Sequence, residues 1–270
     1  MAKVVACVIA RTVSKRLPLK ILRDLKPGLS MIDFLIQRIK SVDKIDEIYL
    51  CTSEEAVDDI LADVVSRNGI KLYRGSADAV IERMLAVGDI EKADVLIRIT
   101  GDNPFASVEF INHQLELLEN RNLDYVRVVD VPIGSTTEVM TTDALKRCYN
   151  TMDPSVSEYL MLFLFEPNHF RCGIIKAFKD DYSSYSVTVD TPDDLIRTKG
   201  ILELLYQKGL NFKLSDLITV YNDSNVKLPA MKISLGGNIK YPYDKIITFD
   251  EFSNDMNRRK ENSTMIKLYE

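Results

Sequence analysis

Strand-like and helix-like segments alternate through the first half of the chain, and this alternation constrains the fold more than any other feature. The expected strands cover residues 3–9, 47–52, 71–74, 94–100 and 124–129. Helical patterns lie between them, at residues 30–39, 54–66, 78–87 and 107–120. Such alternation is typical of βαβ units and a mostly parallel sheet. The near-continuous apolar run Val95, Leu96, Ile97 is typical of a strand with helices on both of its faces, so we predict an α/β protein.

The second half of the chain is less regular. We predict a strand at residues 138–141, helices at 142–149 and 154–165, a strand at 171–177 and a strand-like segment at 186–190. Thr191 is an N-cap residue, and it precedes a proline at the first helical position and the acid Asp194 at the third, which predicts a helix that runs to about Gln207. The main domain is therefore expected to cover residues 1–209.

Residues 210–270 form a C-terminal extension of different composition, richer in Asn, Asp, Ser and Lys. It offers apolar positions without a core of its own, namely Leu228, Met231, Ile233, Ile246, Ile247 and Phe249. We therefore expect it to pack across a partner subunit, which predicts a homodimer. The basic triplet at residues 258–260 is interpreted as a solvated helix face.

Composition excludes several classes of protein. With 46% hydrophobic and 28% charged residues, a 270-residue chain can bury a sizeable core and is not mostly disordered. The net charge of −5 and the absence of long single-sign blocks argue against a nucleic-acid partner. No apolar run approaches the roughly 18 residues of a membrane span. The N-terminus has the pattern of a first strand and lacks that of a signal peptide, so a cytoplasmic location is expected.

The four cysteines are scattered and show neither zinc-site nor disulfide spacing. We expect buried free thiols at Cys7, Cys51, Cys148 and Cys172.

A cationic loop follows the first predicted strand. Residues 10–20 read ARTVSKRLPLK and hold the four cations Arg11, Lys15, Arg16 and Lys20. Ligands of open α/β sheets bind at the carboxyl edge of the strands, and cations so close together repel one another unless an anion is present. A polyphosphate ligand is therefore indicated, and a solvent-facing basic loop is the alternative.

Two aspartates are expected at the same edge. Asp102 follows the strand that ends at Thr100, and Asp190 ends the strand-like segment before the capped helix. Each alone is also compatible with a turn or cap residue. Together with the cationic loop they fit metal-assisted attack on a nucleotide phosphate, because the cations neutralise the phosphates while carboxylates hold Mg²⁺.

Four segments carry a resemblance to a known family. They are residues 10–20, 74–83 (RGSADAVIER), 98–104 (RITGDNP) and 187–195 (VTVDTPDDL). In this order they resemble the sugar-activating cytidylyltransferases, in particular the spore coat polysaccharide biosynthesis protein F family, with the CMP-Kdo and CMP-sialic acid synthetases as more distant relatives. The resemblance covers residues 1–207.

The resemblance implies a nucleotide-diphospho-sugar transferase (GT-A-like) fold, a three-layer sandwich around a mostly parallel mixed sheet. It implies transfer of CMP from CTP to a sugar hydroxyl, with release of pyrophosphate, in surface polysaccharide or glycan synthesis. Arg11, Lys20, Asp102 and Asp190 would be catalytic, and the two aspartates would bind Mg²⁺. Substrate-binding positions would be Ala10, Ser14, Lys15, Arg16, Thr52, Ser76, Asp78, Thr100 and Glu138. An acidic sugar is the expected acceptor.

The chain departs from the family pattern at two positions. Val13 stands where the family has a glycine, and Thr136 stands where it has an acid. A β-branched residue does not readily adopt the positive φ that glycine allows. Two alternatives therefore stay open, a non-catalytic nucleotide-binding paralogue and a glycosyltransferase that uses a nucleotide sugar.

Overall fold

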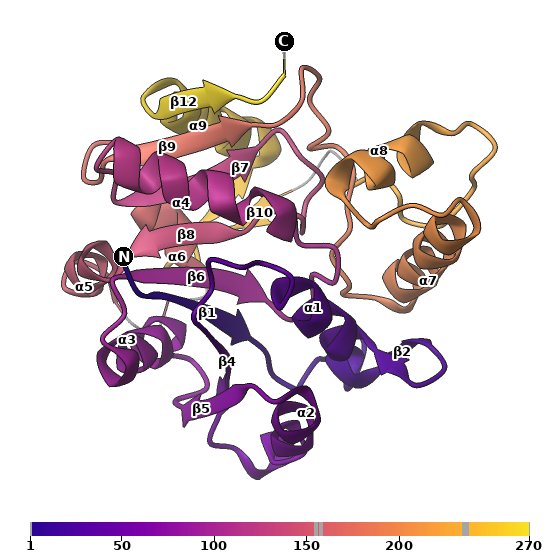
Figure 1. Cartoon of the computed structure of the whole chain (residues 1–270). Helices are drawn as coiled ribbons and strands as arrows, with labels where there is room; N and C mark the ends of the chain where they lie inside the picture. The colour runs from indigo at the N-terminus through magenta and orange to yellow at the C-terminus, as the bar shows by residue number, and fades with distance from the viewer. Residues whose placement is uncertain (1, 154–155, 157–158, 234–237, 270) are drawn as a thin grey trace.

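The computed structural model describes residues 2–153, 156, 159–233 and 238–269, which are built around one eight-stranded sheet (Figure 1). Its order is β12-β9-β7-β8-β6-β1-β4-β5, and β8 runs antiparallel to both of its neighbours while the other pairs are parallel. The strands are β1 (Val4–Ile9), β4 (Glu47–Ser53), β5 (Lys71–Gly75), β6 (Val95–Thr100), β7 (Tyr125–Val129), β8 (Glu138–Thr141), β9 (Cys172–Lys176) and β12 (Thr264–Lys267). The predicted α/β class and mostly parallel mixed sheet are confirmed.

Helices cover both faces of the sheet because its central strands are apolar on both faces. In β1, Val4, Ala6 and Val8 join one core cluster, whereas Val5 and Cys7 join the other. The first cluster includes side chains of α1 (Met31–Ile39), α2 (Leu61–Asn68) and α4 (Ile111–Asn120), and the second includes those of α3 (Val80–Glu91), α5 (Thr142–Tyr149) and α6 (Leu160–Leu164). Within the described ranges, no helix is long and apolar enough to cross a membrane.

Three predicted helices differ from the structure in their bounds or are described only in part. The helix predicted at 54–66 is divided into a 3-10 turn, Ala56–Asp58, and α2, and the helix at 107–120 begins with another 3-10 turn, Val108–Phe110. The helix predicted at 154–165 is described only in part, since residues 154, 155, 157 and 158 lie outside the described residues, and α6 is its helical portion.

The strand predicted at residues 186–190 is wrong. The segment is extended, but its backbone crosses the carboxyl edge of the sheet instead of joining it. The Val187 amide donates to the Ile133 carbonyl at 2.8 Å, and the Val189 amide donates to the Asp102 carbonyl at 3.0 Å. Because these partners lie on loops, the segment satisfies its backbone without a strand neighbour on each side.

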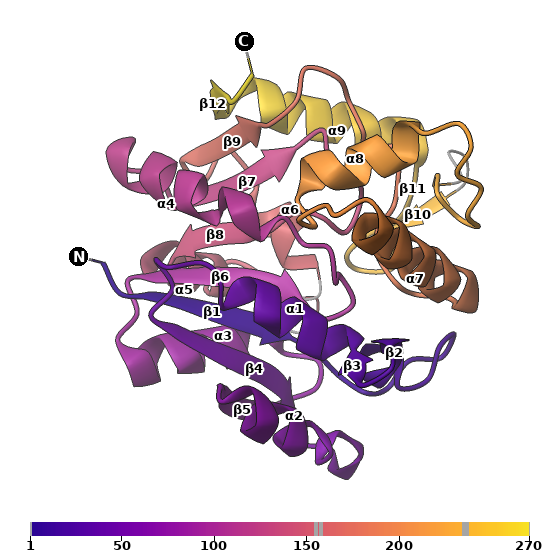
Figure 2. The ribbon, with the colours of Figure 1, turned by 45° about the vertical axis from the view of Figure 1, so that its right-hand side comes forward.

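The predicted helix after Thr191 is confirmed as α7 (Pro192–Gln207), with a capping box between Thr191 and Asp194. It packs with α8 (Leu214–Asn222) and with the small hairpin of β2 (Asp24–Lys26) and β3 (Leu29–Ser30), which follows the 3-10 turn Lys20–Leu22. Figure 2 shows this group beyond the arrowhead of β1.

The C-terminal residues return to the main sheet. After the hairpin of β10 (Asn238–Lys240) and β11 (Ile246–Thr248), α9 (Phe249–Glu261) leads into β12, which pairs with β9 in parallel. The expectation that the basic triplet is a solvated face is wrong. Arg258 donates to Glu166 at 2.7 Å, Arg259 donates to the Leu162 carbonyl at 2.7 Å, and Lys260 pairs with Asp130 at 3.0 Å. The triplet anchors α9 to the body of the protein.

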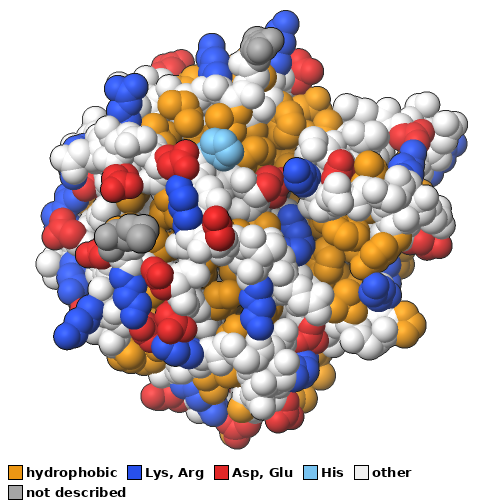
Figure 3. All heavy atoms as spheres, viewed as in Figure 1, with side chains coloured by type: hydrophobic (Ala, Val, Ile, Leu, Met, Phe, Trp, Pro, Cys, Tyr) orange, Lys and Arg blue, Asp and Glu red, His pale blue; other side chains and the backbone are white. Residues whose placement is uncertain are grey.

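The distribution of surface charges and the burial of the cysteines are as expected from the sequence. Figure 3 shows Lys and Arg side chains interspersed with Asp and Glu over the face viewed in Figure 1. All four cysteines are buried free thiols, as expected. Burial raises the pKa of Cys148 to about 12, so this thiol stays protonated at neutral pH.

Glu91, at the end of α3, joins β4, β5 and the residue before β1 at the amino edge of the sheet. Its carboxylate accepts from Lys3 at 2.6 Å, from Lys71 at 2.6 Å and from the Tyr49 hydroxyl at 2.6 Å. These hydrogen bonds, that from Lys3 first, hold the pKa of Glu91 at about 2, below its ordinary 4.5. A depressed pKa contributes stability above pH ~4.5 that is lost as the pH falls toward 2.

We therefore expect Glu91→Gln to lower the free energy of unfolding by about 2 kcal/mol at pH 7. The difference from wild type shrinks as the pH falls through 4.5 toward 3, as measured by urea unfolding at each pH. Asp89→Asn is the matched control, because Asp89 is exposed and pairs only with the exposed Lys146 among the interactions described. An equal loss in both variants would contradict this role for Glu91.

Candidate active site

The candidate site lies where the order of the strands reverses. The chain runs outward from β1 to β4 and β5 and then returns to β6 on the other side of β1. The carboxyl ends of β1 and β6 are therefore adjacent, with Ile9 opposite Thr100. Ligands of open α/β sheets bind in the crevice at such a point. The loops that follow the two strands carry the cationic segment 10–20 and the segment 101–104.

Gly101 allows these two loops to start side by side. Its amide donates to the Ile9 carbonyl at 2.8 Å, and a Cβ on Gly101 would lie 2.9 Å from the Cβ of Ala10. A real side chain does not fit at that distance, so the glycine is required for close approach and not for a positive φ. The small side chain of Ala10 is itself buried where the two loops meet.

Lys20 lies between the two predicted metal ligands. Its Nζ is 2.7 Å from Asp102 Oδ2 and 2.9 Å from Asp190 Oδ1. Burial lowers the pKa of Lys20, but the charges and hydrogen bonds of Asp102 and Asp190 outweigh burial, so the pKa is raised above 10.5. The ammonium is therefore charged at neutral pH. Residues from three distant parts of the chain meet here, as the sequence predicted for one edge of the sheet.

The other loop cations remain accessible. Arg16 Nη2 lies 3.2 Å from Asp190 Oδ1 with 66% of its side chain exposed, and Lys15 is exposed as well. Arg11 donates to the Ala77 carbonyl at 3.1 Å and lies 3.9 Å from Asp78. The Ser14 hydroxyl accepts from the Leu17 amide at 3.3 Å. Cations held at the rim of a crevice in this way suit an anionic ligand that spans it.

Asp58 anchors the cationic loop, and the sequence analysis did not identify it. Its carboxylate, in a residue that is 1% exposed, accepts from the Thr12 amide at 2.7 Å, the Thr12 hydroxyl at 2.6 Å, the Thr52 hydroxyl at 3.0 Å and the Ser53 hydroxyl. Burial raises the pKa of Asp58, but these hydrogen bonds outweigh burial and lower it. The ionised carboxylate thus joins the loop after β1 to the loop after β4.

Three of the expected substrate-binding residues are divided between the surface and the interior. Ser76 and Asp78 are exposed on the loop after β5, where a ligand can reach them. Thr52 is fully buried and donates to Asp58, so it presents no surface to a ligand and acts on the site through the loop. Arg83, which is 1% exposed, lies against Gly75 at the end of β5, and its Nε and Nη2 have no hydrogen-bond partner among the described residues.

Val13 does not strain the loop. Among the described residues, positive φ in this segment occurs at Leu19, at 56°, and not at Val13. The Val13 side chain is 57% exposed, so it occupies the surface of the loop without a burial cost. The backbone therefore accommodates a β-branched residue at the position where the family has glycine.

A cavity of about 720 Å³ opens beside this crevice. Its walls include Thr100 at the end of β6, Asn103 in the loop that follows, Glu138 of β8 and Arg127 of β7. Gly134, with φ of 89°, closes one side; a Cβ there would lie 2.7 Å from both Asn103 Oδ1 and the Thr188 amide nitrogen. The cavity includes Asn103 of the loop that carries Asp102, and Gly134 in its wall lies against Thr188 of the segment 186–190.

Glu138 is buried in the wall of this cavity. It pairs with Arg98 and accepts from the Tyr125 hydroxyl at 2.6 Å. Burial raises the pKa of Glu138, but Arg98 and Arg127 outweigh burial and lower it. The carboxylate is therefore ionised, and its ion pair and hydrogen bond hold the cavity wall in position. The Thr136 hydroxyl donates to the Val128 carbonyl at 3.2 Å and stabilises the same wall.

Asp102 and Asp190 supply oxygen ligands of the kind that Mg²⁺ prefers. Both carboxylates approach Lys20, and among the described residues no group of three or more acidic, His or Cys side chains could hold a metal ion. The oxygens of Asp102 and Asp190 are hard ligands, and both side chains are about one-third exposed, which leaves room for the water ligands that Mg²⁺ retains.

We expect Asp58→Ala to free the cationic loop. The Thr12 amide should exchange its hydrogen about 10-fold faster or more, because its acceptor is lost, and the amides to residue 20 should follow. Hydrogen–deuterium exchange by mass spectrometry measures this. Asp59→Ala is the control, since Asp59 is 64% exposed and pairs with Arg74. Unchanged protection in Asp58→Ala would refute the anchoring role.

The chain is similar in sequence to known proteins. The chain is 34% identical over 171 residues to an uncharacterized protein of Methanocaldococcus jannaschii, an alignment that covers 63% of this chain and 70% of the relative. It is 29% identical over 225 residues to the spore coat polysaccharide biosynthesis protein SpsF of Bacillus subtilis, covering 79% of this chain and 91% of that protein.

The fold has a close counterpart among solved structures. A cytidylyltransferase from Leptospira borgpetersenii serovar Hardjo-bovis matches with a TM-score of 0.77 at 23% identity, over 87% of this chain and 100% of that one. This likeness confirms the expected nucleotide-diphospho-sugar transferase-like fold. The family model described as cytidylyltransferase matches residues 5–160, which hold β1, the cationic loop, Asp102 and Glu138. The chain therefore belongs to the cytidylyltransferase family.

Proposed function

We propose that this protein transfers CMP from CTP to a hydroxyl of an acidic sugar, with Mg²⁺ as cofactor and pyrophosphate as leaving group, in the synthesis of a surface polysaccharide. The observation that carries the proposal is the contact of Lys20 with Asp102 and Asp190 at the carboxyl edge of the sheet. The similarity to the Bacillus subtilis spore coat polysaccharide protein supports the pathway class.

The cationic loop would hold the triphosphate of CTP. Arg11, Lys15 and Arg16 are exposed around the crevice, and Lys20 is fixed at its floor. Fixed cations stabilise the charge that accumulates on the leaving pyrophosphate, and they need no reorganisation when it forms because the loop is already tied to Asp58.

When bound at Asp102 and Asp190, Mg²⁺ would supply charge neutralisation at the phosphates and would favour ionisation of the acceptor hydroxyl. The chain's own residues position the reactants. Asp102 and Asp190 hold Lys20 between them, Arg16 neutralises Asp190 from the solvent side, and the tightly packed Gly101 turn fixes where Asp102 lies.

The neighbouring cavity would hold the acceptor. Arg127 is among the residues that line it, and its buried Nε has no hydrogen-bond partner among the described residues. Cations in a partly buried pocket favour a carboxylate, which supports an acidic sugar. Tyr159 lines the cavity too, whereas Arg171 is held by Asp124 at 2.9 Å and lies outside it.

The features that suggested a non-catalytic paralogue do not weaken the proposal. Val13 takes an ordinary backbone conformation, and Thr136 is hydrogen-bonded in the cavity wall. A non-catalytic paralogue predicts CTP binding that is insensitive to Asp190→Asn. The glycosyltransferase alternative predicts cleavage of a nucleotide sugar with no pyrophosphate formed.

We also propose a homodimer formed through residues after 210. Tyr243 and Ile246, on the hairpin of β10 and β11, are each 63% exposed, and such apolar surface favours a protein partner. Light scattering should give twice the mass of 30.7 kDa. Ile246→Lys should shift the protein toward monomer, whereas a monomer in the unmodified chain would refute the dimer.

The enzymatic proposal predicts pyrophosphate release from CTP with Mg²⁺ and a panel of acidic sugars. Lys20→Ala and Asp190→Asn should each lower kcat/KM about 100-fold or more, since each removes a charge that acts in the transition state. Asp193→Asn, on the exposed first turn of α7, should keep full activity.

Chelation of Mg²⁺ should abolish the reaction, and a thermal-shift titration should show that CTP stabilises the protein more when Mg²⁺ is present. Failure to bind CTP and to release pyrophosphate with every acceptor would overturn the proposal.

A further inference from the structure

Arg197 is a charged residue in the interior of the protein. It lies on the second turn of α7 and is 0% exposed. Its guanidinium donates to Asp194 at 2.7 Å, to the Ala230 carbonyl at 2.5 Å and to the Thr188 carbonyl. Burying a charge is costly unless the charge is paired and hydrogen-bonded. Arg197 meets this condition by joining the start of α7 to the segment before it and to the chain after α8.

Asp194 divides its two oxygens between Arg197 and the backbone that precedes α7. Its Oδ1 accepts from Arg197. Its Oδ2 accepts from the Thr191 amide at 2.8 Å, the Thr191 hydroxyl at 2.8 Å and the Asp190 amide at 3.0 Å. A capping box requires only the bond to the amide of the N-cap residue. The bond to the Asp190 amide is additional, and it restrains a residue that lies before the helix.

The ion pair of Arg197 with Asp194 thus holds the backbone on both sides of Asp190. Before Asp190, Arg197 binds the Thr188 carbonyl, and after it, Asp194 binds the Thr191 amide. The segment 186–190 does not join the main sheet, so no strand ladder fixes the place where it ends. The buried ion pair supplies this restraint instead.

The restrained segment contacts the other aspartate directly. The Val189 amide donates to the Asp102 carbonyl at 3.0 Å, so Asp102 and Asp190 lie on backbones that are hydrogen-bonded to each other. Their carboxylates meet at Lys20, 2.7 and 2.9 Å from its Nζ. Functional groups keep their geometry only where such supporting contacts hold them. A shift of the 186–190 backbone would therefore move Asp190 relative to both Asp102 and Lys20.

We propose that Arg197 is a positioning residue of the candidate active site, which sets where the Asp190 carboxylate lies opposite Asp102. It acts through Asp194 and the Thr188 carbonyl, since its own side chain is fully buried. Its planar guanidinium suits this role because it donates in several directions at once, which a lysine ammonium on a flexible stem does not reproduce. The inference rests on the proposed function, because it assigns a role in the site where CTP and Mg²⁺ would bind.

The test measures CTP binding to the full chain by isothermal titration calorimetry, in EDTA and in Mg²⁺. We expect Arg197→Met to bind CTP in EDTA as wild type does. The gain in CTP affinity that Mg²⁺ gives should fall about 10-fold, because a displaced Asp190 no longer lies where it would hold the metal. Arg197→Lys keeps a charge opposite Asp194 but loses the planar fork, so it should recover part of this gain.

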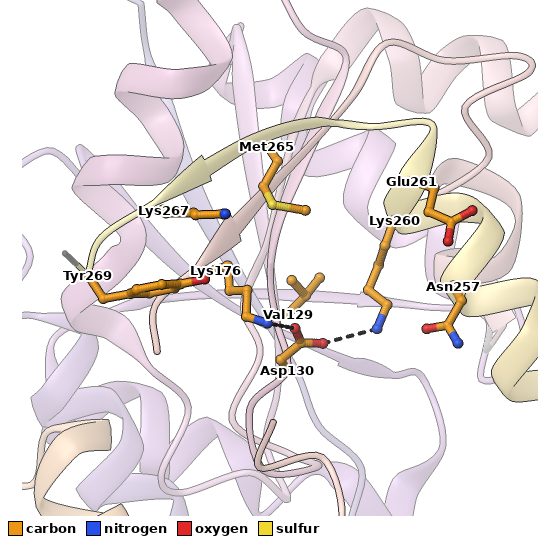
Figure 4. A pocket seen from close by; sticks show the side chains of 9 residues that line it. All are labelled: Val129, Asp130, Lys176, Asn257, Lys260, Glu261, Met265, Lys267 and Tyr269. Atoms are coloured by element: carbon orange, nitrogen blue, oxygen red, sulfur yellow. Dashed lines mark hydrogen bonds and ion pairs between the residues drawn. The ribbon is translucent and has the colours of Figure 1, made fainter. Parts of the chain in front are cut away.

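Arg259→Met is the matched control. Arg259 of α9 is also a buried arginine, 5% exposed, that donates to backbone carbonyls, those of Leu162 at 2.7 Å and Phe165 at 2.5 Å. The variant therefore loses the same kind of buried contact at a place outside the candidate site. Its neighbour Lys260 stays paired with Asp130 at 3.0 Å, the contact drawn in Figure 4, and keeps α9 attached. CTP binding and its gain from Mg²⁺ should be unchanged.

A gain from Mg²⁺ that survives in Arg197→Met, or that falls equally in Arg259→Met, would overturn the role of Arg197. Circular dichroism establishes that each variant is folded. If Arg197→Met is not, Arg197→Lys carries the test, with a smaller loss of the gain expected and no loss refuting the proposal. The unmodified protein separates the two proposals, since absence of CTP binding there defeats the proposed function, whereas a gain that persists in the folded Arg197 variants defeats only the positioning role.

Discussion

The ammonium of Lys20 between Asp102 and Asp190 is the interaction on which the arrangement of the site depends. Lys20 is 82 residues from one partner and 170 from the other. Two carboxylates at one edge of a buried sheet repel each other, and a half-buried lysine without a partner would lose its proton more easily. The Lys20 ammonium therefore offsets the repulsion between the two carboxylates, and the carboxylates keep Lys20 protonated. The same three groups bring together the loop after β1, the loop after β6 and the segment before α7.

The elements predicted correctly are those specified by local chemistry. The strand at 138–141 and the helix at 142–149 agree with the structure at both ends, and the helix after Thr191 begins at its capping box. A cap, a helical period or a continuous apolar run is complete within a few residues, so no distant contact is needed to recognise it. The positions of Asp102 and Lys20 followed because carboxyl ends of parallel strands share one edge.

The features that were missed depend on distant partners. Asp58 looks like an ordinary acid in a helical pattern, and its importance comes from Thr12, 46 residues earlier in the chain. The segment 186–190 alternates like a strand, yet its hydrogen bonds go to the loops at Ile133 and Asp102. The basic triplet of α9 resembles a solvated face, but Glu166, Asp130 and two backbone carbonyls neutralise or accept from it. None of these partners can be assigned from the spacing of residues along the sequence.

The two halves of the site differ in how they are built. The part around Lys20 uses loops that leave adjacent strands, so its geometry follows from the order of the sheet. The neighbouring cavity is closed on one side by α9, which is fastened to Asp130 at the end of β7. Changes on the cavity face of α9 alter that side of the cavity without touching Lys20, Asp102 or Asp190. The loops that carry Lys20 and Asp102 are thus built independently of the C-terminal helix, which is held to the sheet through Asp130.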